Sequence, residues 1–454
     1  MPKISVLMPC LNVVKYITQC MDSVICQTLT DIEILIIDAG SVDGTLQILH
    51  EYMHKDSRIH LIHSDKKSYG YQMNMGISLA CGNYIAIVET DDIIQPEMLE
   101  VLYQKAVETN ADYVKGTSEG FYRESGGMEW RFSILPCKEL IKNNEYCAVP
   151  KDTPELFLYD NFLWNGIYKT VFMRKIKFNE TPGAAFQDIG ALFQILSTAQ
   201  KGVYCKYFVY HYRQDNFNAS SYNRKGLMYT AEEYDYTEQF IRKLSGKWNR
   251  VYYLKMVGLT VDRFHAMAIS GEYWPEAEGG IKRLRERVLL AVRNGLILPE
   301  ECEDWQKSLW FKLDLFLKSP NSLFEYLKQD YEIKFIRLKE IYETAILHKI
   351  YIFGAGKTGQ FVAMFLLMKG IKNIIGYCDN NVELQGKSLG RFSVLSPSEA
   401  VEKQPDAFYI IAVKNYVHEI KEQMVELGVS EDRIEIYSMG TDTSLLQRKL
   451  DKKS

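Results

Sequence analysis

The sequence has no uninterrupted apolar stretch of the roughly 20 residues that a membrane-spanning helix requires. Its N-terminus leads directly into a short apolar segment, so no cleavable signal peptide is expected. The nine cysteines include no C-x-x-C pair, which argues against a zinc site and for reduced, mostly buried thiols. A net charge of −4 gives no electrostatic basis for binding nucleic acid. We therefore expect a cytoplasmic protein, with peripheral contact at the inner face of a membrane left open.

The chain is long enough for more than one folded unit. With 454 residues, of which 47% are hydrophobic, it has ample apolar side chains for two or three packed cores. Neither length nor composition predicts whether the protein forms a homo-oligomer, and that alternative stays open.

Three apolar segments near the N-terminus, residues 4–8, 33–37 and 84–88, are predicted to be buried strands. Residues 16–27 have helical spacing, and a strand, helix and strand in this order favour parallel strands with a right-handed crossover. The polar residues after each strand should therefore meet at the carboxyl edge of one sheet. Open α/β sheets bind their ligands at this edge.

The third strand leads into the acidic stretch Glu89-Thr90-Asp91-Asp92. Carboxylates suit hard cations such as Mg²⁺ or Mn²⁺, which bind through one or two carboxylates plus the phosphates of a substrate. An isolated acidic pair is also typical of a solvated turn or a helix cap. The convergence of three strand ends favours a site that holds a divalent cation against a diphosphate.

Residues 1–222 resemble a family 2 glycosyltransferase of the GT-A fold. The resemblance depends on several motifs in a fixed order, which makes it more specific than any one of them. The motifs lie at residues 6–12, 23–28, 33–45, 74–77, 80–85 and 89–92. The resemblance implies an α/β domain that binds a nucleotide-sugar donor and transfers its sugar to an acceptor. The donor is expected to be a UDP-sugar, and the acceptor a hydroxyl of a glycan or of a lipid-linked glycan.

The resemblance assigns the metal site to the acidic stretch. Asp91 and Asp92 would hold Mn²⁺ or Mg²⁺, with Asp92 as the direct ligand and Asp91 beside the ribose or a metal-bound water. Glu89 belongs to the same motif and would lie on the donor side.

The nucleobase pocket, by the same resemblance, would be formed by Pro9, Leu11 and Asp38. Two positions depart from the family pattern. Many relatives have an aromatic residue where this chain has Leu11, and a second Asp where it has Ala39. The identity of the base is therefore less well defined than in typical members.

Sugar transfer with inversion also needs a general base that removes the proton of the acceptor hydroxyl. In the family this base commonly lies in an acidic pair before a helix, and the matching stretch is residues 183–190. Gln187 replaces the first acid there, which leaves Asp188 as the candidate base. The alternative is that Asp188 only caps the helix predicted for residues 189–196, and the two roles are compatible.

Two further segments are candidates for substrate contacts. Arg213, together with the loop at residues 218–221, matches the family's closing segment and could pair with the diphosphate, although a surface arginine would look the same. Trp164 and Asn165 lie in the region that usually lines the acceptor side, where a Trp can stack on a sugar ring. The alternative for Trp164 is a place in the hydrophobic core.

Residues 223–347 have the pattern of long amphipathic helices, for example 229–244 and 281–296, separated at Gly271, Pro299 and Pro320. This region contains no acidic motif or phosphate-binding loop. Its aromatic residues are expected to form helix-packing core, and the alternative is a dimer surface or an acceptor groove.

A second nucleotide-type pattern begins at residues 349–353, a predicted strand. Gly354, Gly356 and Gly359 then fit G-x-G-x-x-G, a helix comes next, and Asp379 ends the next predicted strand. This segment, 348–440, resembles the small Rossmann-like domains joined to sugar-modifying enzymes. It could bind a nucleotide, a nucleotide sugar or NAD(P), or act as a scaffold. The polar tail at 441–454 is expected to be frayed or a short helix.

The sequence thus predicts a GT-A domain (1–222), a helical domain or linker (223–347), a Rossmann-like domain (348–440) and a tail. The expected function is inverting, metal-dependent sugar transfer in bacterial surface polysaccharide or lipopolysaccharide synthesis. One alternative is a nucleotide-sugar oxidoreductase that uses the C-terminal domain. Another is a catalytically idle nucleotide-sugar sensor, for which Ala39 and Gln187 would be signs of decay.

Overall fold

The computed structural model describes residues 1–123, 129–134, 145–183, 185–216, 223–242, 244, 246–389 and 391–438. The chain divides into two compact units. The first comprises Met1–Tyr122, Arg131–Arg263 and Trp274–Leu323, and the second comprises Arg123–Trp130, Phe264–Tyr273 and Phe324–Ser454. The domain boundaries expected after residues 222, 347 and 440 stay predictions. The tail expected at 441–454 lies outside the described residues.

The first unit is built on a mixed sheet with the strand order β3-β2-β1-β4-β9-β6-β10-β5, to which β7 and β8 are added beside β6 and β10. Strands β1 to β4 are parallel to one another, and β9 runs antiparallel to both β4 and β6. The strands are β1 (Ile4–Cys10), β2 (Ile32–Asp38), β3 (Ile59–His63), β4 (Tyr84–Ile87), β5 (Ile93–Ile94), β6 (Tyr113–Arg123), β7 (Glu129–Ile134), β8 (Glu145–Ala148), β9 (Gly166–Lys169) and β10 (Gly202–Arg213).

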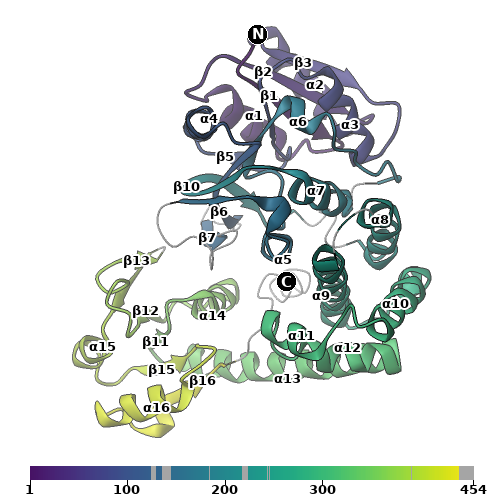
Figure 1. Ribbon diagram of the computed structural model, residues 1–454. Coiled ribbons are helices and arrows are strands. Elements are labelled where there is room, and N and C mark those ends of the chain that lie inside the picture. The colour runs from purple at the N-terminus through teal and green to yellow at the C-terminus, as the bar shows by residue number, and fades with distance from the viewer. Residues whose placement is uncertain are drawn as a thin grey trace. The chain divides into compact units, whose positions relative to one another are not determined.

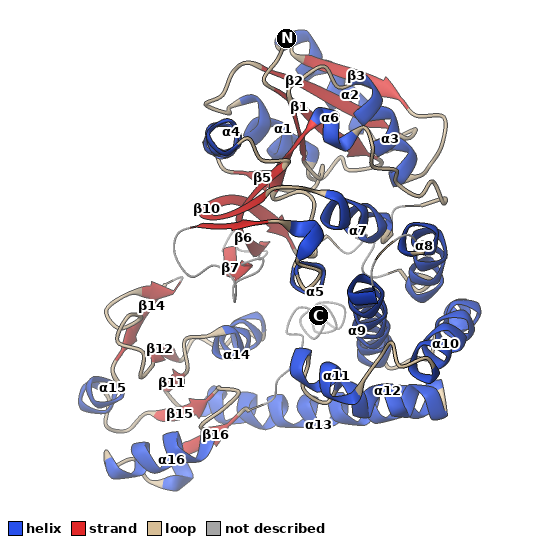
Figure 2. Ribbon diagram, in the orientation of Figure 1, coloured by secondary structure: helices blue, strands red, loops and turns tan. Residues whose placement is uncertain are grey.

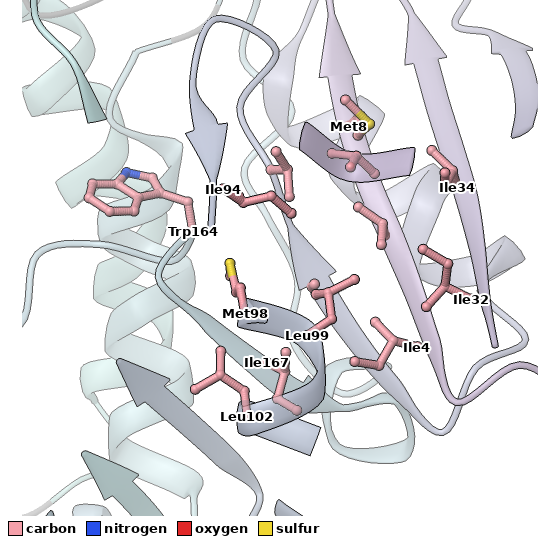
Figure 3. Close-up of a cluster of buried hydrophobic side chains, with 14 of the residues drawn as sticks. Ile4, Met8, Ile32, Ile34, Ile94, Met98, Leu99, Leu102, Trp164 and Ile167 are labelled. Carbon is pink, nitrogen blue, oxygen red and sulfur yellow. The ribbon is translucent and has the colours of Figure 1, made fainter. Parts of the chain in front are cut away.

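Helices cover this sheet because its parallel strands are apolar on both faces. Helix α3 packs on β1 and β2, while α4 packs on β9 and β10 (Figure 1). Figure 3 shows Met8 of β1 and Ile34 of β2 in one buried cluster with Leu99 and Leu102 of α4. The helices are α1 (Ile17–Ile25), α2 (Thr45–Lys55), α3 (Tyr69–Leu79), α4 (Met98–Thr109), α5 (Leu156–Tyr159), α6 (Thr170–Met173) and α7 (Gln187–Thr198).

The three strands expected from residues 4–8, 33–37 and 84–88 are confirmed as β1, β2 and β4, and the helix expected between the first two is α1. Since β1 pairs in parallel with both β2 and β4, the residues after all three strands lie at one edge of the sheet. This arrangement brings the acidic stretch beside the end of β1.

Only helices and a 3₁₀ turn are described between β10 and β11 (Figure 2). The two helices predicted there exist, but each begins and ends three residues earlier than expected, at Gly226–Ile241 and Glu278–Arg293. The second ends early because Gly295 adopts a φ of +65°, which stops the helix before Pro299. These helices are α8 (Gly226–Ile241), α9 (Gly246–Ser270), α10 (Glu278–Arg293), α11 (Pro299–Trp305), α12 (Leu309–Lys318) and α13 (Pro320–Leu347).

The second unit contains a separate sheet with the order β13-β14-β12-β11-β15-β16. Its strands are parallel except β13, and β11 lies between β12 and β15, which gives a mixed α/β arrangement. The strands are β11 (Ile350–Phe353), β12 (Ile374–Cys378), β13 (Ser388–Leu389), β14 (Phe392–Leu395), β15 (Phe408–Ile411) and β16 (Ile434–Ile436), with helices α14 (Lys357–Met368), α15 (Pro397–Lys403) and α16 (Val417–Glu426).

Candidate active site

A cavity of about 330 Å³ opens at the edge of the first sheet where β1 and β4 end. Pro9 and Leu11 line it at the end of β1, and Glu89 and Asp91 line it after β4. The remaining wall comes from the start of α3, the segment before β9, the start of α7 and one residue of β10. Site residues expected from separate strand ends therefore meet around one cavity.

Two acids of the predicted metal motif face this cavity. The Tyr69 hydroxyl donates a hydrogen bond of 2.9 Å to Glu89 Oε1, and Asn216 Nδ2 donates one of 2.7 Å to Asp91 Oδ2. Burial and the charge of Asp91 raise the pKa of Glu89 to about 8. Burial also raises the pKa of Asp91. A cation beside Glu89 and Asp91 would favour their ionised forms, which burial disfavours.

Asp92 has a different environment from its neighbour. Its side chain is fully buried, and it does not line the cavity. The Tyr210 hydroxyl donates to its Oδ2 at 2.9 Å, and the backbone N–H of Arg213 donates to its Oδ1 at 2.7 Å. Through these two hydrogen bonds the Asp92 carboxylate links the acidic stretch to β10. Of the two adjacent aspartates, Asp91 lines the cavity and Asp92 does not.

Arg213 is also turned into the protein. Its guanidinium donates to the carbonyl of Asp91 at 2.6 Å and to Gln19 Oε1 at 2.7 Å, and it lies over the rings of Tyr16 and Phe121. It does not line the cavity. The loop expected to close over the site, residues 218–221, lies outside the described residues.

The predicted nucleobase residues separate into two groups. Pro9 and Leu11 line the cavity, and Leu11 is exposed. Asp38 is buried and accepts hydrogen bonds from the backbone of Gly40 and Ser41 and from the Ser41 hydroxyl. Ser41 Oγ in turn accepts from the backbone N–H of Asn12 at 2.8 Å. Asp38 thus fixes the loop after β2 against the loop after β1.

Asp188 lies in the first turn of α7 and lines the same cavity as Glu89 and Asp91. Burial raises its pKa to about 6, while backbone hydrogen bonds and the charge of Lys255 act in the opposite direction. A carboxyl group with this pKa can accept a proton near neutral pH. Position and pKa are both compatible with the predicted base.

Gln187, which stands where the family has an acid, holds the loop before α7. Its Oε1 accepts from the backbone N–H of Ala185 at 2.9 Å, and its Nε2 donates to the carbonyls of Thr181 and Gly183. The amide can donate and accept at once, which a carboxylate cannot do. The substitution therefore has a structural use beside Asp188.

Aromatic side chains form one wall of the cavity. Phe162, Trp164 and Tyr212 line it, and the Trp164 ring stacks on Tyr212 with centroids 5.0 Å apart and on Tyr210 at 4.3 Å. Trp164 also belongs to the hydrophobic core (Figure 3). Asn165 is fully buried, donates to the carbonyl of Gly116 and does not line the cavity.

Several cavity residues were not anticipated from the sequence. Lys67 and Tyr69 line the cavity before and at the start of α3, and the backbone of Tyr69 donates to the carbonyl of Gly183 at 2.9 Å. Asn161 and Phe186 extend the wall. Of these residues, Phe186 lies in the predicted stretch 183–190, while Lys67, Tyr69 and Asn161 belong to no predicted motif and reach the site only because distant segments pair.

A second cavity, of about 550 Å³, lies in the second unit where β11, β12 and β15 end. Asp379, Lys414 and Tyr416 line it. Both oxygens of Asp379 accept backbone N–H groups, from Ala355 at 2.7 Å and Asn381 at 2.8 Å. The predicted glycine positions 354, 356 and 359 lie around the start of α14 and do not line this cavity.

Comparison with known proteins decides the family. The model described as "Glycosyl transferase family 2" matches residues 5–165. Glycosyltransferase GlyG of Streptococcus pneumoniae serotype 4 is 32% identical over 219 residues, which cover 46% of this chain and 70% of that protein. The chain belongs to glycosyltransferase family 2.

Other relatives are similar to this glycosyltransferase over matches of comparable length. Uncharacterized glycosyltransferase YibD of Escherichia coli K12 is 28% identical over 256 residues, covering 55% of this chain and 72% of YibD. GlyA of S. pneumoniae is 30% identical over 215 residues, which cover 46% of this chain but only 30% of GlyA. A second family model, "C2185-like, N-terminal", matches residues 346–435.

The fold also matches a solved structure. S. aureus TarS 1–349 in complex with UDP-GlcNAc is 17% identical, has a TM-score of 0.54, and covers 73% of this chain and 91% of that one. The structure of TarS 1–349 without this ligand gives a TM-score of 0.51. At this identity the likeness supports the fold and carries no assignment of substrate.

Proposed function

We propose that this glycosyltransferase moves a sugar from a UDP-sugar to a hydroxyl of a glycan or lipid-linked acceptor, with inversion at the anomeric carbon. The main support is that Asp188, Glu89 and Asp91 line a single cavity at the carboxyl edge of the sheet. Two acids and one candidate base in the same cavity match the needs of a direct displacement. The choice of a uridine donor follows the family resemblance, and the TarS structure of similar fold was solved with UDP-GlcNAc.

A divalent cation fits the donor side of the cavity. Among the described residues no three His, Cys, Asp or Glu side chains converge on a point, so these residues alone do not enclose a metal. Mg²⁺ and Mn²⁺ are commonly bound by one or two carboxylates together with substrate phosphates, and the confined acids Glu89 and Asp91 provide such a set. A bound cation would offset the charge of the departing diphosphate. We assign the direct contact to Asp91, since both oxygens of Asp92 already accept hydrogen bonds from the protein.

The remaining roles belong to the chain's own side chains. Asp188 accepts the proton of the acceptor hydroxyl at its carboxylate. Trp164 and Tyr212 offer ring faces to the apolar side of a sugar, and Pro9 and Leu11 offer apolar contacts to the base. Arg213 and Asp38 do not line the cavity. Arg213 instead holds the acidic stretch through the carbonyl of Asp91, and Asp38 holds the loop after β2.

The test is release of nucleotide from a panel of UDP-, GDP-, dTDP- and CMP-sugars, with Mn²⁺ and with chelator, in the presence of a mixed glycan acceptor. We expect turnover of a UDP-sugar that requires the metal and is lost in Asp188→Asn. Tight donor binding without any release would support the idle sensor instead. Release that persists in chelator would contradict the metal assignment.

For the second unit we propose a Rossmann-like fold that binds a nucleotide or nucleotide sugar in its own cavity. The supporting observation is the cavity of about 550 Å³ beside Asp379 at the carboxyl edge of a parallel sheet. Calorimetric titration with UDP, UDP-sugars and NAD(P) should then reveal two binding events in the wild type. Asp379→Ala should remove one of them, while Glu383→Ala, at an exposed position nearby, should keep both. A single event in the wild type would contradict this proposal.

We propose polysaccharide assembly at the bacterial surface as the pathway, on the basis of relatives. Similar stretches occur in proteins named chondroitin synthase of E. coli, 37% identical over 100 residues, and EpsJ of Bacillus subtilis, 35% identical over 175 residues. In the described part of the chain, no helix is long and apolar enough to cross a membrane.

A further inference from the structure

Lys255, a buried lysine of helix α9, contacts a residue that lines the cavity, Asn161. Lys255 lies in α9 and is only 3% exposed. Its ammonium group donates hydrogen bonds to the carbonyls of Phe157 at 2.7 Å and Asp160 at 3.2 Å, and to Oδ1 of Asn161. A buried ammonium is stable only when its donors are satisfied, and these oxygens satisfy them.

The segment that Lys255 holds leads directly into the cavity wall. Asn161 lines the cavity, as do Phe162 and Trp164. The other side of the segment is fixed by Lys115 of β6, whose Nζ lies 2.6 Å from Asp160 Oδ2 and 2.5 Å from the carbonyl oxygen of Phe162. Two buried lysines, Lys255 and Lys115, thus hold the segment that leads into the proposed acceptor side of the cavity.

Aromatic packing explains why Lys255 occupies this position. Phe193 of α7 contacts Phe157 of α5, with ring centroids 5.2 Å apart, and also Trp248 and Tyr252 of α9, at 5.5 and 5.4 Å. Helix α9 is therefore docked on the same helix that carries Asp188. The position of Lys255 relative to the site depends on this cluster.

The charges around Asp188 come from several elements. Lys255 is a cation that acts on Asp188, and it favours the ionised carboxylate. Three acidic groups also interact with the charge of Asp188: Tyr69 of α3, Glu89 after β4 and Glu233 of α8. The same cavity is lined by two further charged residues, Lys67 and Asp91.

We propose that Lys255 is a positioning residue for sugar transfer: its hydrogen bonds order the wall at Asn161 to Trp164. This role rests on the proposed function. It makes the region after residue 222 part of the catalytic unit, where the sequence suggested only packing core, a dimer surface or an acceptor groove.

The experiment compares wild type, Lys255→Met, Lys255→Gln and the control Lys247→Met, which removes an exposed lysine from the same helix. The measurements are UDP affinity, acceptor KM and the pH profile of kcat/KM for one donor and acceptor pair. We expect both Lys255 variants to keep their UDP affinity. The acceptor KM should rise by about tenfold or more in Lys255→Met, and by less in Lys255→Gln, whose amide keeps part of the hydrogen bonds. The acidic limb of the profile should move to higher pH in both, because both lose the positive charge. Lys247→Met should behave as wild type.

A uniform fall in kcat, with acceptor KM and acidic limb unchanged, would overturn the positioning role in favour of a purely structural one. Should Lys255→Met fail to fold, Lys255→Gln decides, because its amide can still donate to the carbonyls but carries no charge. A wild-type enzyme that transfers from no donor would instead overturn the proposed function, and the role of Lys255 with it.

Discussion

Among single residues, the two adjacent acids Asp91 and Asp92 have different environments. Asp91 faces the cavity, whereas Asp92 is buried against Tyr210 and Arg213. The family resemblance favoured Asp92 as the direct metal ligand, whereas we propose Asp91, because Asp91 is the one of the two that lines the cavity. Adjacent carboxylates have the same chemistry, so the local sequence does not tell Asp91 and Asp92 apart. They differ through hydrogen bonds from β10, such as the one that Asp92 accepts from Tyr210, a residue 118 positions further along the chain.

The first prediction separates these acids by stability and rate. Asp92→Ala leaves the Tyr210 hydroxyl and the Arg213 N–H without their buried acceptor, so it should cost about 1–3 kcal/mol of unfolding free energy. Asp91→Ala should cost less, yet lower metal-dependent UDP release by about a hundredfold or more. Thermal unfolding and product release on both variants provide the measurement. Equal loss of stability with normal release in Asp91→Ala would contradict the assignment.

The second prediction concerns the pH dependence of transfer. Asp188 has a pKa raised to about 6 and must be ionised to accept a proton. Below that pH, kcat/KM should therefore fall by about tenfold per pH unit, and it should level off above it. A pH–rate profile with a saturating donor measures this. A rate that stays constant down to about pH 5 would show that another group is the base.

Among helices and strands, the sequence predicted those that depend on local pattern. Strands β1, β2 and β4 were identifiable because a fully buried parallel strand is a continuous apolar run. The helices α8 and α10 were identifiable in kind, but each lies three residues earlier than predicted. For α10 the early end has a local cause, the positive φ of Gly295. The packing of α8 and α9 on α7 could not be predicted, because it depends on contacts between segments far apart in the chain.

The third prediction tests this packing at Gly190 of α7. A Cβ atom at Gly190 would clash with Glu233 Oε1 and lie 2.6 Å from Thr237 Oγ1, both on α8. Gly190→Ala should therefore separate the helices, destabilise the unit by about 1–3 kcal/mol and reduce transfer. Gly246→Ala is the control, because no atom lies within 4 Å of a Cβ there. Similar melting temperatures for the two variants would exclude the close contact.

The chain as a whole divides into two units, and two of the buried clusters of the described residues lie in different units. The cluster around β1 and α4 belongs to the first unit, and the one around Tyr409 and Ile411 belongs to the second. The match to GlyG covers only 46% of the chain, so sequence similarity to this relative says little about the second unit. The alternation of strands and helices around the glycine motif was predictable from local pattern, but the cavity beside Asp379 was not, because loops from three strands form it.

The fourth prediction concerns these two units. Calorimetric unfolding should show two transitions, since each unit has a buried cluster of its own and multi-unit chains need not unfold in one step. UDP with Mn²⁺ should stabilise the first unit by about 2.7 kcal/mol at a ligand concentration of a hundred times Kd, and so raise the temperature of its transition. Asp91→Ala should weaken this shift. One transition that responds as a whole would show that the units unfold as a single cooperative body.

Transfer by this enzyme, as proposed, is a single displacement in which Asp188 activates the acceptor while the donor's diphosphate departs from the opposite side. The anomeric configuration of the product, determined by NMR on the first sugar transferred, tests this directly. We expect inversion relative to the donor. Retention would contradict the single displacement, because one base acting on the acceptor hydroxyl does not preserve the configuration.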